Sequence, residues 1–292
     1  MRKKIVLITG SSGHLGSQLA SLLQPIFNVM TLSRSDKKAT LHVDISKLSQ
    51  PDIESIYKNY PIDAVIHCAG ITNPKTEEDV SFNAYSFTKF LTQPHVRHVL
   101  IGSVSEYGFP KTKTISEKTP EHPITSYGVS KLLQKRVASY FYFTHKTDIV
   151  YFRVSNIIMP YGRQDSLIES IFRASQKPKE KVQISSRAVS RDFIDIRDLS
   201  NAIQMAVLAP THDFLYNLCS GRRMTYDTFI DTFREEWEKT QRSSFPSITY
   251  TGMPENYYPG RYSTLKIKKT FGWKTHYSLR ESLHWLIQKR NG

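Results

Sequence analysis

Short apolar runs alternate with helix-like segments along the first half of the chain, and this alternation limits the folds that it can adopt. The runs are KKIVLIT, FNVMTLS, AVIHCAG, HVLIGSV and DIVYFRV, and between them lie amphipathic segments such as SQLASLLQ, PDIESIYKNY and SKLLQKRVASYFYF. Strands that alternate with helices form right-handed crossover units, which build a parallel sheet with helices on both faces. Runs rich in Val, Ile and Leu fit strands buried on both faces. The sequence therefore predicts an α/β fold of the Rossmann type, with a doubly wound parallel sheet.

The alternation loosens after about residue 157, and this change predicts a second, smaller part of the molecule. We expect the dinucleotide-binding domain to consist of residues 1–157 together with about 191–219. Residues 158–190 and 220–292 would form a smaller mixed part that covers the carboxyl ends of the strands and binds the substrate. Ligands of open α/β sheets bind at that edge. A length of 292 residues suffices for one large domain or two moderate ones.

A glycine-rich loop follows the first predicted strand. In TGSSGHLG, Gly10, Gly13 and Gly16 have the spacing GxxGxxG, and a helix pattern comes next. Glycine lets the backbone approach a pyrophosphate closely, and the free N–H groups and dipole of the following helix attract it. Alone, such a motif also describes a turn that binds nothing. Its position between a strand and a helix is the context of a dinucleotide site, which is what we expect here.

The end of the second predicted strand bears on the choice between NAD and NADP. Sites that prefer NAD usually carry an acid there, which holds the ribose 2′-hydroxyl. Here the strand ends in Ser33 and Arg34, and an arginine pairs well with a 2′-phosphate. Asp36 lies two residues further on and could instead fold back toward the ribose. The charge argument favours NADP(H), with NAD(H) as the alternative.

Tyr127 and Lys131 lie four residues apart in TSYGVSK, at the start of a predicted helix, and therefore share one of its faces. A free tyrosine has a pKa of about 10, and a neighbouring ammonium or an oxidised nicotinamide ring favours its phenolate. Such a tyrosine can give and take a proton near neutral pH. Ser103, at the end of HVLIGSV, should finish at the same sheet edge and orient the substrate oxygen. For a lone YxxxK pair, a buried helix-face tyrosine would be the ordinary alternative.

The chain carries a net charge of +14, which attracts polyanions such as nucleic acid and phosphorylated small molecules. Because the basic residues are dispersed, we interpret this charge as a basic solvated surface. No motif of an RNA-binding module is visible, and we expect no nucleic-acid partner. His14 lacks the clustered partners that a metal site needs, so we also expect no metal.

The sequence favours a cytoplasmic protein without a membrane span. No apolar run approaches the roughly 20 residues that cross a bilayer. The start, MRKKIVLITG, has too short an apolar run for a signal peptide and is expected to be the first strand. The two cysteines, Cys68 and Cys219, lie far apart in apolar segments and do not indicate a disulfide framework.

The motifs occur in an order that resembles the extended short-chain dehydrogenases/reductases, in the group of nucleotide-sugar epimerases, dehydratases and reductases. The matching segments span nearly the whole chain: TGSSGHLG, LHVDIS, HCAG, SVSEYG, YGVSK, FRVSNIIMPYG, RDFIDIRDL, YNLCSGRRMTYDTF and FGWKTHYSLRESL. The resemblance implies a catalytic triad of Ser103, Tyr127 and Lys131. In it, Ser103 would hydrogen-bond the substrate oxygen and Tyr127 would exchange a proton with it. Lys131 would hold the cofactor ribose and lower the pKa of Tyr127.

Motifs and resemblance together give a set of cofactor-binding residues. Asp44 matches the acid that contacts adenine in the family, and Asn83 matches a structural asparagine of the helix after the fourth strand. The full set is Gly10, Ser12, Gly13, His14, Leu15, Gly16, Ser33, Arg34, Asp44, Ile45, Cys68, Ala69, Gly70, Asn83, Tyr127 and Lys131.

Five residues are expected to contact the substrate: Ser105, Tyr107, Asn156, Arg191 and Arg261. Asn156 and Arg191 match family positions that contact sugar or diphosphate. Arg261 matches a later phosphate-binding arginine, and a surface charge is the alternative. Ser105 either hydrogen-bonds the substrate or is a turn residue, and Tyr107 is expected to shape the sugar pocket without taking part in the chemistry. The resemblance thus implies a nucleotide-diphosphate sugar as substrate and leaves its base and sugar open.

The family carries out three reactions that share a hydride transfer. Dehydratases carry an acid between the serine or threonine and the next tyrosine, where this chain has Val104 and Ser105. Glu106 is displaced by one residue, which on a strand points to the other face, so we expect no dehydration. Epimerases keep NAD tightly bound, whereas reductases exchange NADPH. Ser33, Arg34 and the compact C-terminal part favour a 4-ketoreductase, with a 4-epimerase as the alternative.

Two further expectations come from the resemblance. Relatives that have lost catalysis and sense NADP or bind RNA commonly lack the tyrosine or the lysine, and this chain has both. Members of the family often form homodimers through the helices that carry Tyr127 and precede Ser103. The stretch VASYFYF could supply such a face, or it could be the inner face of its own helix.

Overall fold

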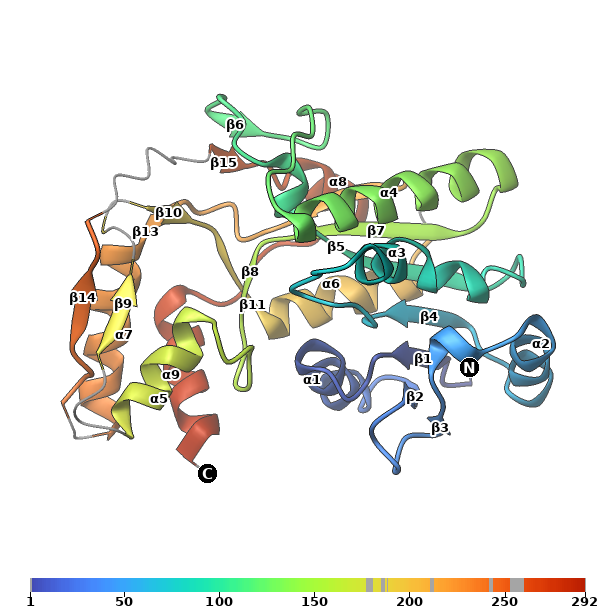
Figure 1. The fold of residues 1–292 in the computed structure, drawn as a ribbon, viewed down its shortest axis with the longest axis horizontal. Helices are drawn as coiled ribbons and strands as arrows, with labels where there is room; N and C mark the ends of the chain where they lie inside the picture. The colour runs from blue at the N-terminus through green and yellow to red at the C-terminus, as the bar shows by residue number, and fades with distance from the viewer. Residues whose placement is uncertain are drawn as a thin grey trace.

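The larger part of the protein is built around a sheet of seven parallel strands (Figure 1). The computed structural model describes residues 2–176, 181–184, 187, 189–210, 213–241, 244–252 and 260–291. The strand order is β12-β7-β5-β4-β1-β2-β3, and each neighbouring pair is parallel. The strands are β1 (Ile5–Thr9), β2 (Asn28–Ser33), β3 (Leu41–His42), β4 (Ala64–His67), β5 (Arg97–Ser103), β7 (Ile149–Val154) and β12 (Leu215–Leu218). The predicted doubly wound parallel sheet is confirmed.

The order of the strands reverses beside β1, and this reversal determines where a ligand can bind. From β1 the chain moves outward to β2 and β3, and it then returns to β4 on the other side of β1. The connections that leave β1 and β4 therefore run to opposite faces of the sheet. A crevice opens between such connections at the carboxyl ends of the strands.

Helices cover both faces of the sheet. One face packs against α1 (His14–Leu23), α6 (Ile196–Leu208) and α8 (Leu265–Phe271), and the other against α2 (Gln50–Asn59), α3 (Glu77–Tyr85) and α4 (Ser126–His145). Side chains of β1 alternate accordingly, because Val6 and Ile8 pack on the α1 and α6 side while Leu7 packs on the α2 side. This double burial explains why the strand sequences are almost continuously apolar.

The smaller part has a hydrophobic core of its own, made largely by three helices and a short parallel pair of strands. The helices are α5 (Leu167–Ser175), α7 (Tyr226–Gln241) and α9 (Leu279–Asn291), and the strands are β9 (Val182–Ile184) and β14 (Ile248–Tyr250). Three further short pairs are β8 (Asn156–Ile158) with β11 (Phe193–Asp195), β10 (Ser190–Arg191) with β13 (Met224–Thr225), and β6 (Thr114–Ile115) with β15 (Arg261–Tyr262).

One segment lies elsewhere than its predicted domain. The prediction assigned all of 220–292 to the smaller part, but Ile267 of α8 and Trp273 are buried in the core of the large sheet, among α6 and β12 residues. The chain thus returns to the larger part before it forms α9 in the smaller one. Residues 177–180 and 253–259, which the prediction assigned to the smaller part, are not among the described residues.

Within the described residues, three short 3-10 helices connect the main elements: η1 (Ile45–Lys47), η2 (Ser86–Phe90) and η3 (Val104–Tyr107). The start of η3 is a capping box, in which Ser103 Oγ accepts the N–H of Ser105 at 3.1 Å and Glu106 accepts the N–H of Ser103 at 2.9 Å. The chain therefore turns into a helix directly after Ser103, where the sequence reading had continued the strand.

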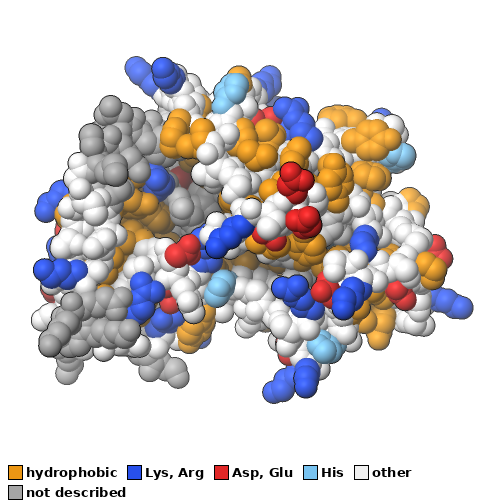
Figure 2. All heavy atoms as spheres, viewed as in Figure 1, with side chains coloured by type: hydrophobic (Ala, Val, Ile, Leu, Met, Phe, Trp, Pro, Cys, Tyr) orange, Lys and Arg blue, Asp and Glu red, His pale blue; other side chains and the backbone are white. Residues whose placement is uncertain are grey.

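Charged side chains are dispersed over the molecular surface. In the view of Figure 2, Lys and Arg side chains are spread over both parts, with Asp and Glu side chains between them. The net charge of +14 thus acts as a diffuse positive field on this face. Among the described helices, none has the length and apolarity needed to cross a membrane.

Candidate active site

A cavity of about 620 Å³ lies at the carboxyl ends of the central strands. Its walls come from the glycine loop before α1, the residues after β4 and β5, the first turns of α4, and the loop that leads into α5. Predicted site residues that line it are Gly13, His14, Leu15, Gly16, Cys68, Gly70, Ser103, Ser105, Tyr127, Lys131 and Asn156. The fold therefore brings the glycine loop and the predicted triad into one space.

The glycine loop has the shape that a pyrophosphate requires. Gly10 has a positive φ of 66°, and a Cβ there would lie 2.6 Å from the backbone of Ala69. Helix α1 begins at His14, its N-cap Gly13 makes no side-chain hydrogen bond, and its first turn carries no acid. Because the first N–H groups of a helix have no partner within it, this end can accept an anion. The loop thus fits a dinucleotide.

A cluster of hydroxyl groups lies at the end of β2. Ser33 Oγ donates to Ser12 Oγ at 2.7 Å, and Ser12 Oγ lies 2.9 Å from Ser35 Oγ. Arg34 is largely exposed beside them, and its Nη1 is 3.8 Å from Oδ2 of Asp44. The Oδ1 of Asp36 accepts the N–H of Lys38 at 2.9 Å, within its own turn.

The predicted adenine contacts lie in the next loop. Asp44 caps η1 by accepting the N–H of Ser46 at 2.9 Å and its hydroxyl at 2.8 Å. These two hydrogen bonds, with a smaller contribution from Arg34, lower the pKa of Asp44. The side chain of Ile45 is buried among core residues of the α2 side.

Helix α4 carries Tyr127 and Lys131 to the end of β5. Thr125 caps the helix by accepting the N–H of Gly128 at 3.0 Å. The Nζ of Lys131 donates to the carbonyl of Ile101 at 2.8 Å and lies 5.9 Å from the centre of the Tyr127 ring. Ser103 ends β5 and lines the same cavity as Tyr127 and Lys131. The sequence-predicted triad is therefore assembled in space.

Burial controls the proton affinities of the triad. It lowers the pKa of Lys131 to about 8, although the negative charge of Glu106 opposes the change. It raises the pKa of Tyr127 to about 12, and Glu106 acts in the same direction. Arg163 and the hydrogen bond with Ser103 oppose this rise. In the chain without cofactor, the phenol is thus protonated at neutral pH, whereas the sequence reading expected Lys131 to lower its pKa.

Two predicted site residues, Tyr107 and Asn83, are fully buried and make their hydrogen bonds inside the protein. Tyr107 is fully buried and does not line the cavity, because its hydroxyl donates to Asn217 Oδ1 at 2.6 Å and to the carbonyl of Ser116 at 3.0 Å. Asn83 is also fully buried, and it bonds both backbone groups of Ile71 and the hydroxyl of Ser130. It fixes the loop after β4 against α4 and leaves no polar atom for a cofactor.

The predicted substrate arginines lie apart from the main cavity. Arg191 and Arg261 border a separate small hollow together with Arg223, which the sequence reading did not single out. Asn156, at the start of β8, lines the main cavity and donates to the carbonyl of Asp192 at 3.0 Å.

Several lining residues were not foreseen. They include Thr72 after β4, Arg163 and Asp165 before α5, and Phe193 and Tyr226 from the smaller part. Arg163 follows directly on the matched segment FRVSNIIMPYG, so an extension of that segment by a few residues would have included it. Within the described residues, no group of three or more His, Cys, Asp or Glu side chains could hold a metal ion.

The parallel sheet, the glycine loop at its switch point and the Ser-Tyr-Lys triad define an NAD(P)-dependent oxidoreductase of the extended short-chain dehydrogenase/reductase type. The sequence profile of the NAD dependent epimerase/dehydratase family matches residues 6–219. The chain belongs to this family, which comprises nucleotide-sugar epimerases, dehydratases and reductases.

Known relatives resemble the chain over nearly its whole length. The dTDP-6-deoxy-L-talose 4-dehydrogenase (NAD(+)) of Aggregatibacter actinomycetemcomitans is 22% identical, over 85% of this chain and 97% of that protein. The GDP-6-deoxy-D-mannose reductase of Pseudomonas aeruginosa is 24% identical, over 97% of this chain and 95% of that protein. The solved structure of RMD from Pseudomonas aeruginosa complexed with NADPH has a TM-score of 0.81 at 20% identity, over 98% of both chains.

Proposed function

We propose that this protein is an NADPH-dependent 4-ketoreductase that acts on a nucleoside diphosphate 4-keto-sugar. The observation that carries the proposal is the state of Tyr127. Tyr127 lines the cavity together with Ser103, and its pKa is raised to about 12, so its phenol is protonated at neutral pH. Reduction of a carbonyl needs such an acid beside the oxygen that becomes a hydroxyl.

Each member of the triad has its own task in this reaction. The Oγ of Ser103 accepts the N–H of Ser105, which leaves the hydroxyl hydrogen for a substrate oxygen or for Tyr127. Tyr127 gives its phenolic proton to the carbonyl oxygen as negative charge develops there, and the Lys131 ammonium stabilises the resulting phenolate. When bound, the reduced nicotinamide supplies the hydride to the carbonyl carbon. The products are the sugar alcohol and the oxidised nicotinamide.

The residues after Ser103 argue against dehydration. Val104 and Ser105 line the cavity and carry no acid. Glu106 is fully buried, and its carboxylate accepts from Ser103, Tyr151 and Arg153 inside the protein. A buried carboxylate with this many donors cannot reach a substrate carbon to take or give a proton.

The preference for NADP rests on the hydroxyl cluster. Ser12, Ser33 and Ser35 offer donors beside Arg34, and a phosphate accepts such bonds. Asp36, the residue that would favour NAD, uses its carboxylate within its own turn. Relatives use either cofactor, since one is named for NAD(+) and one was solved with NADPH.

The size of the chain agrees with the reductase reading. The two relatives named for 4-dehydrogenation and reduction are covered over 97% and 95% of their lengths. Their names pair a nucleotide with a 6-deoxy sugar, so dTDP- and GDP-linked 4-keto-6-deoxyhexoses are the first substrates to test. A 4-epimerase is the second candidate, because relatives at 22% and 24% identity are named as UDP-glucose and UDP-arabinose 4-epimerases.

The proposal is tested on the purified protein. The protein is denatured, any released nicotinamide is identified by mass, and the intact protein is titrated with NADPH and NADH. NADPH oxidation is then followed with the two 4-keto-sugars, with Tyr127→Phe as the control. We expect an exchangeable site that prefers NADPH and turnover that Tyr127→Phe abolishes. Stoichiometric NAD that survives dialysis, with interconversion of two sugar epimers, would replace the reductase by the epimerase.

Arg34 gives a separate test of the cofactor choice. We expect Arg34→Ala to weaken NADPH binding about tenfold and NADH binding less than twofold, since a charge-assisted hydrogen bond contributes roughly 1.5 kcal/mol. Lys37→Ala, which removes an exposed charge from the same loop, is the matched control. Dissociation constants from quenching of protein fluorescence measure both effects, and equal losses for the two cofactors would remove the NADP preference.

A further inference from the structure

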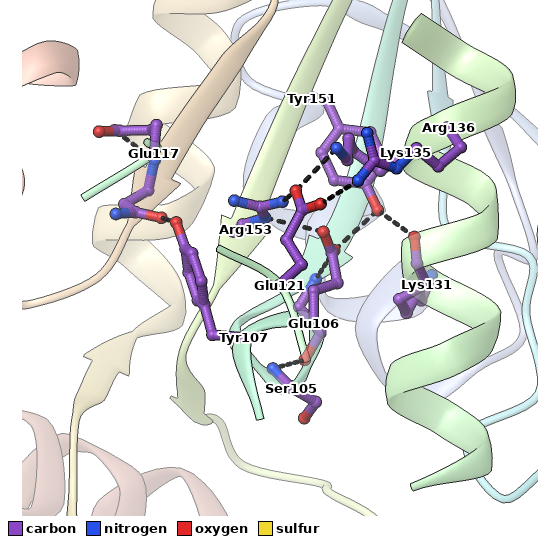
Figure 3. Close-up of polar contacts among 12 residues, drawn as sticks. Ser105, Glu106, Tyr107, Glu117, Glu121, Lys131, Lys135, Arg136, Tyr151 and Arg153 are labelled. Atoms are coloured by element: carbon purple, nitrogen blue, oxygen red, sulfur yellow. Dashed lines mark hydrogen bonds and ion pairs between the residues drawn. The ribbon is translucent and has the colours of Figure 1, made fainter. Parts of the chain in front are cut away.

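Glu106 is a buried carboxylate that the proposed reaction does not use. It lies in η3, its side chain is fully enclosed, and it does not line the cavity. Its Oε1 accepts the backbone N–H of Ser103 at 2.9 Å and the hydroxyl of Tyr151 at 2.9 Å, and its Oε2 accepts from Nε of Arg153 at 2.7 Å. Figure 3 shows these groups between the strands and α4. One carboxylate thus joins three elements.

Tyr151 connects this carboxylate to the helix that carries the triad. Its hydroxyl is shared between Glu106 and the backbone carbonyl of Lys131, which is also 2.9 Å away. Its ring lies directly over Gly102, where an added Cβ would be 2.2 Å from the ring. Gly102 immediately precedes Ser103. The tyrosine therefore packs on the end of β5 and bonds to the turn of α4 at Lys131.

A second connection joins the same network to α4 one turn further along. Arg153 is fully buried and pairs with Glu121 as well as with Glu106. Glu121 in turn lies 2.7 Å from Nζ of Lys135. Although burial opposes the charge of Arg153, the Glu106 carboxylate raises the pKa of the guanidinium above its ordinary value, so the arginine stays charged. Loss of one partner would leave a buried charge unpaired, which is strongly destabilising.

We propose that Glu106 is a positioning residue for the triad, which acts through Ser103 and Tyr151 to fix the distance between the end of β5 and the first turns of α4. The proposal rests on the triad chemistry of the proposed function but not on the identity of the sugar. Ser103 lies at one end of the connection and Tyr127 with Lys131 at the other. A misplacement of about 1 Å can lower the rate a hundredfold. A short buried link that holds Ser103 at a fixed distance from Tyr127 and Lys131 therefore supports catalysis.

Glu106 also acts on Lys131 through its charge. The titratable groups beside the Lys131 side chain are Tyr127 on its own helix, Cys68 after β4 and Glu106 in η3, and Tyr151 on β7 bonds to its backbone carbonyl. Of these, Glu106 is the largest contributor that raises the pKa of Lys131. Removal of its charge should therefore lower that pKa, and Lys131 should lose its proton at a lower pH.

The experiment uses Tyr151→Phe, which keeps the ring over Gly102 and removes only the hydroxyl. We expect kcat to fall tenfold or more while KM for the sugar and for NADPH stays within about twofold. Tyr57→Phe is the matched control, because Tyr57 is a partly buried tyrosine whose hydroxyl donates to the carbonyl of Phe90 at 2.8 Å, and neither residue lines the cavity. Its kcat should be unchanged at a similar melting temperature. A kcat of Tyr151→Phe within twofold of the parent would overturn the proposal.

Glu106→Gln, which keeps the shape of the side chain, tests the charge. We expect the alkaline limb of the kcat/KM profile to move to lower pH in this variant and to stay in place in Tyr57→Phe. The proton affinity of Lys131 is also measured without turnover, by competitive labelling with acetic anhydride and mass spectrometry of the Lys131 peptide. Because the labelling needs no turnover, it tests the role of Glu106 independently of the proposed function. If no 4-keto-sugar is reduced, only the proposed function is refuted. An unchanged titration of Lys131 in Glu106→Gln would refute the role of Glu106.

Discussion

At the scale of single residues, burial shifts the pKa values of Tyr127 and Lys131 more than any neighbouring charge does. The spacing of Tyr127 and Lys131 suggests that the ammonium lowers the pKa of the phenol. In the free chain the opposite holds, because burial and the charge of Glu106 outweigh other effects and raise the pKa of Tyr127 to about 12. A protonated phenol suits reduction, and a bound oxidised nicotinamide, which is positive, would favour the phenolate that oxidation needs.

Replacement of Tyr127 by phenylalanine should separate chemistry from binding. Because Tyr127 supplies the proton, we expect kcat for carbonyl reduction to fall by roughly 10²–10⁴-fold. Binding of NADPH should change less than twofold, since the ring and the hydrogen bonds of Lys131 remain. Single-turnover kinetics and cofactor titration measure the two effects, and undiminished turnover would assign the proton transfer to another group.

The pH dependence of reduction should report Lys131. Its ammonium stabilises the developing phenolate, and its pKa is lowered to about 8. The contribution of the ammonium is therefore complete below that value and is lost as the pH rises through it. We expect kcat/KM, which titrates the free enzyme, to be level near pH 6–7 and to fall above about pH 8. A profile from pH 6 to 10 tests this, and Lys131→Met should show a low, flat profile in place of the falling limb.

At the scale of elements, helix α4 has two different faces. Ser130, Lys131, Gln134 and Ala138 are buried against the sheet. Along the opposite face, four exposed apolar side chains follow one another: Val129, Leu133, Tyr140 and Phe143. The stretch VASYFYF thus contributes to the inner face through Ala138 and to the exposed face through Tyr140 and Phe143.

This exposed face is where we expect a second copy of the chain to pack. Its side chains are separated by four, seven and three residues, so all four lie along one side of the helix. Leu133→Glu places a charge in the middle of the stripe and should raise the dimer dissociation constant at least tenfold. Light scattering coupled to size-exclusion chromatography measures the mass of each form. The control is Arg136→Glu, which changes an exposed neighbour that pairs with Glu121. A parent protein that is monomeric at high concentration would contradict the expected dimer.

At the scale of the whole molecule, the sequence predicted what depends on local pattern and could not predict what depends on distant partners. Periodicity and glycine spacing were sufficient for the parallel sheet and for the triad. Arg153 reads as one polar residue in an apolar strand, and its partners Glu106 and Glu121 come from segments 47 and 32 residues away. The return of α8 to the sheet likewise depends on Ile267 and Trp273 packing against α6 and β12.

The core of the smaller part should depend on its last helix. Leu286 of α9 is fully buried among residues of α5 and α7, so Leu286→Ala should lower the free energy of unfolding by about 2–5 kcal/mol. Leu265→Ala is the control, because that side chain is 75% exposed and should cost less than 0.5 kcal/mol, as roughly expected for surface changes. Urea denaturation followed by fluorescence compares the two, and similar losses would place α9 outside the core.

Because α9 comes late in the sequence, it is synthesised after the other elements named above. All strands of the large sheet except β12, together with the glycine loop and the triad, lie before residue 155, whereas α9 starts at residue 279. A ribosome therefore releases the elements of the dinucleotide site well before the helix that completes the core of the smaller part. On the nascent chain, the means to hold a cofactor exist before the means to enclose a sugar.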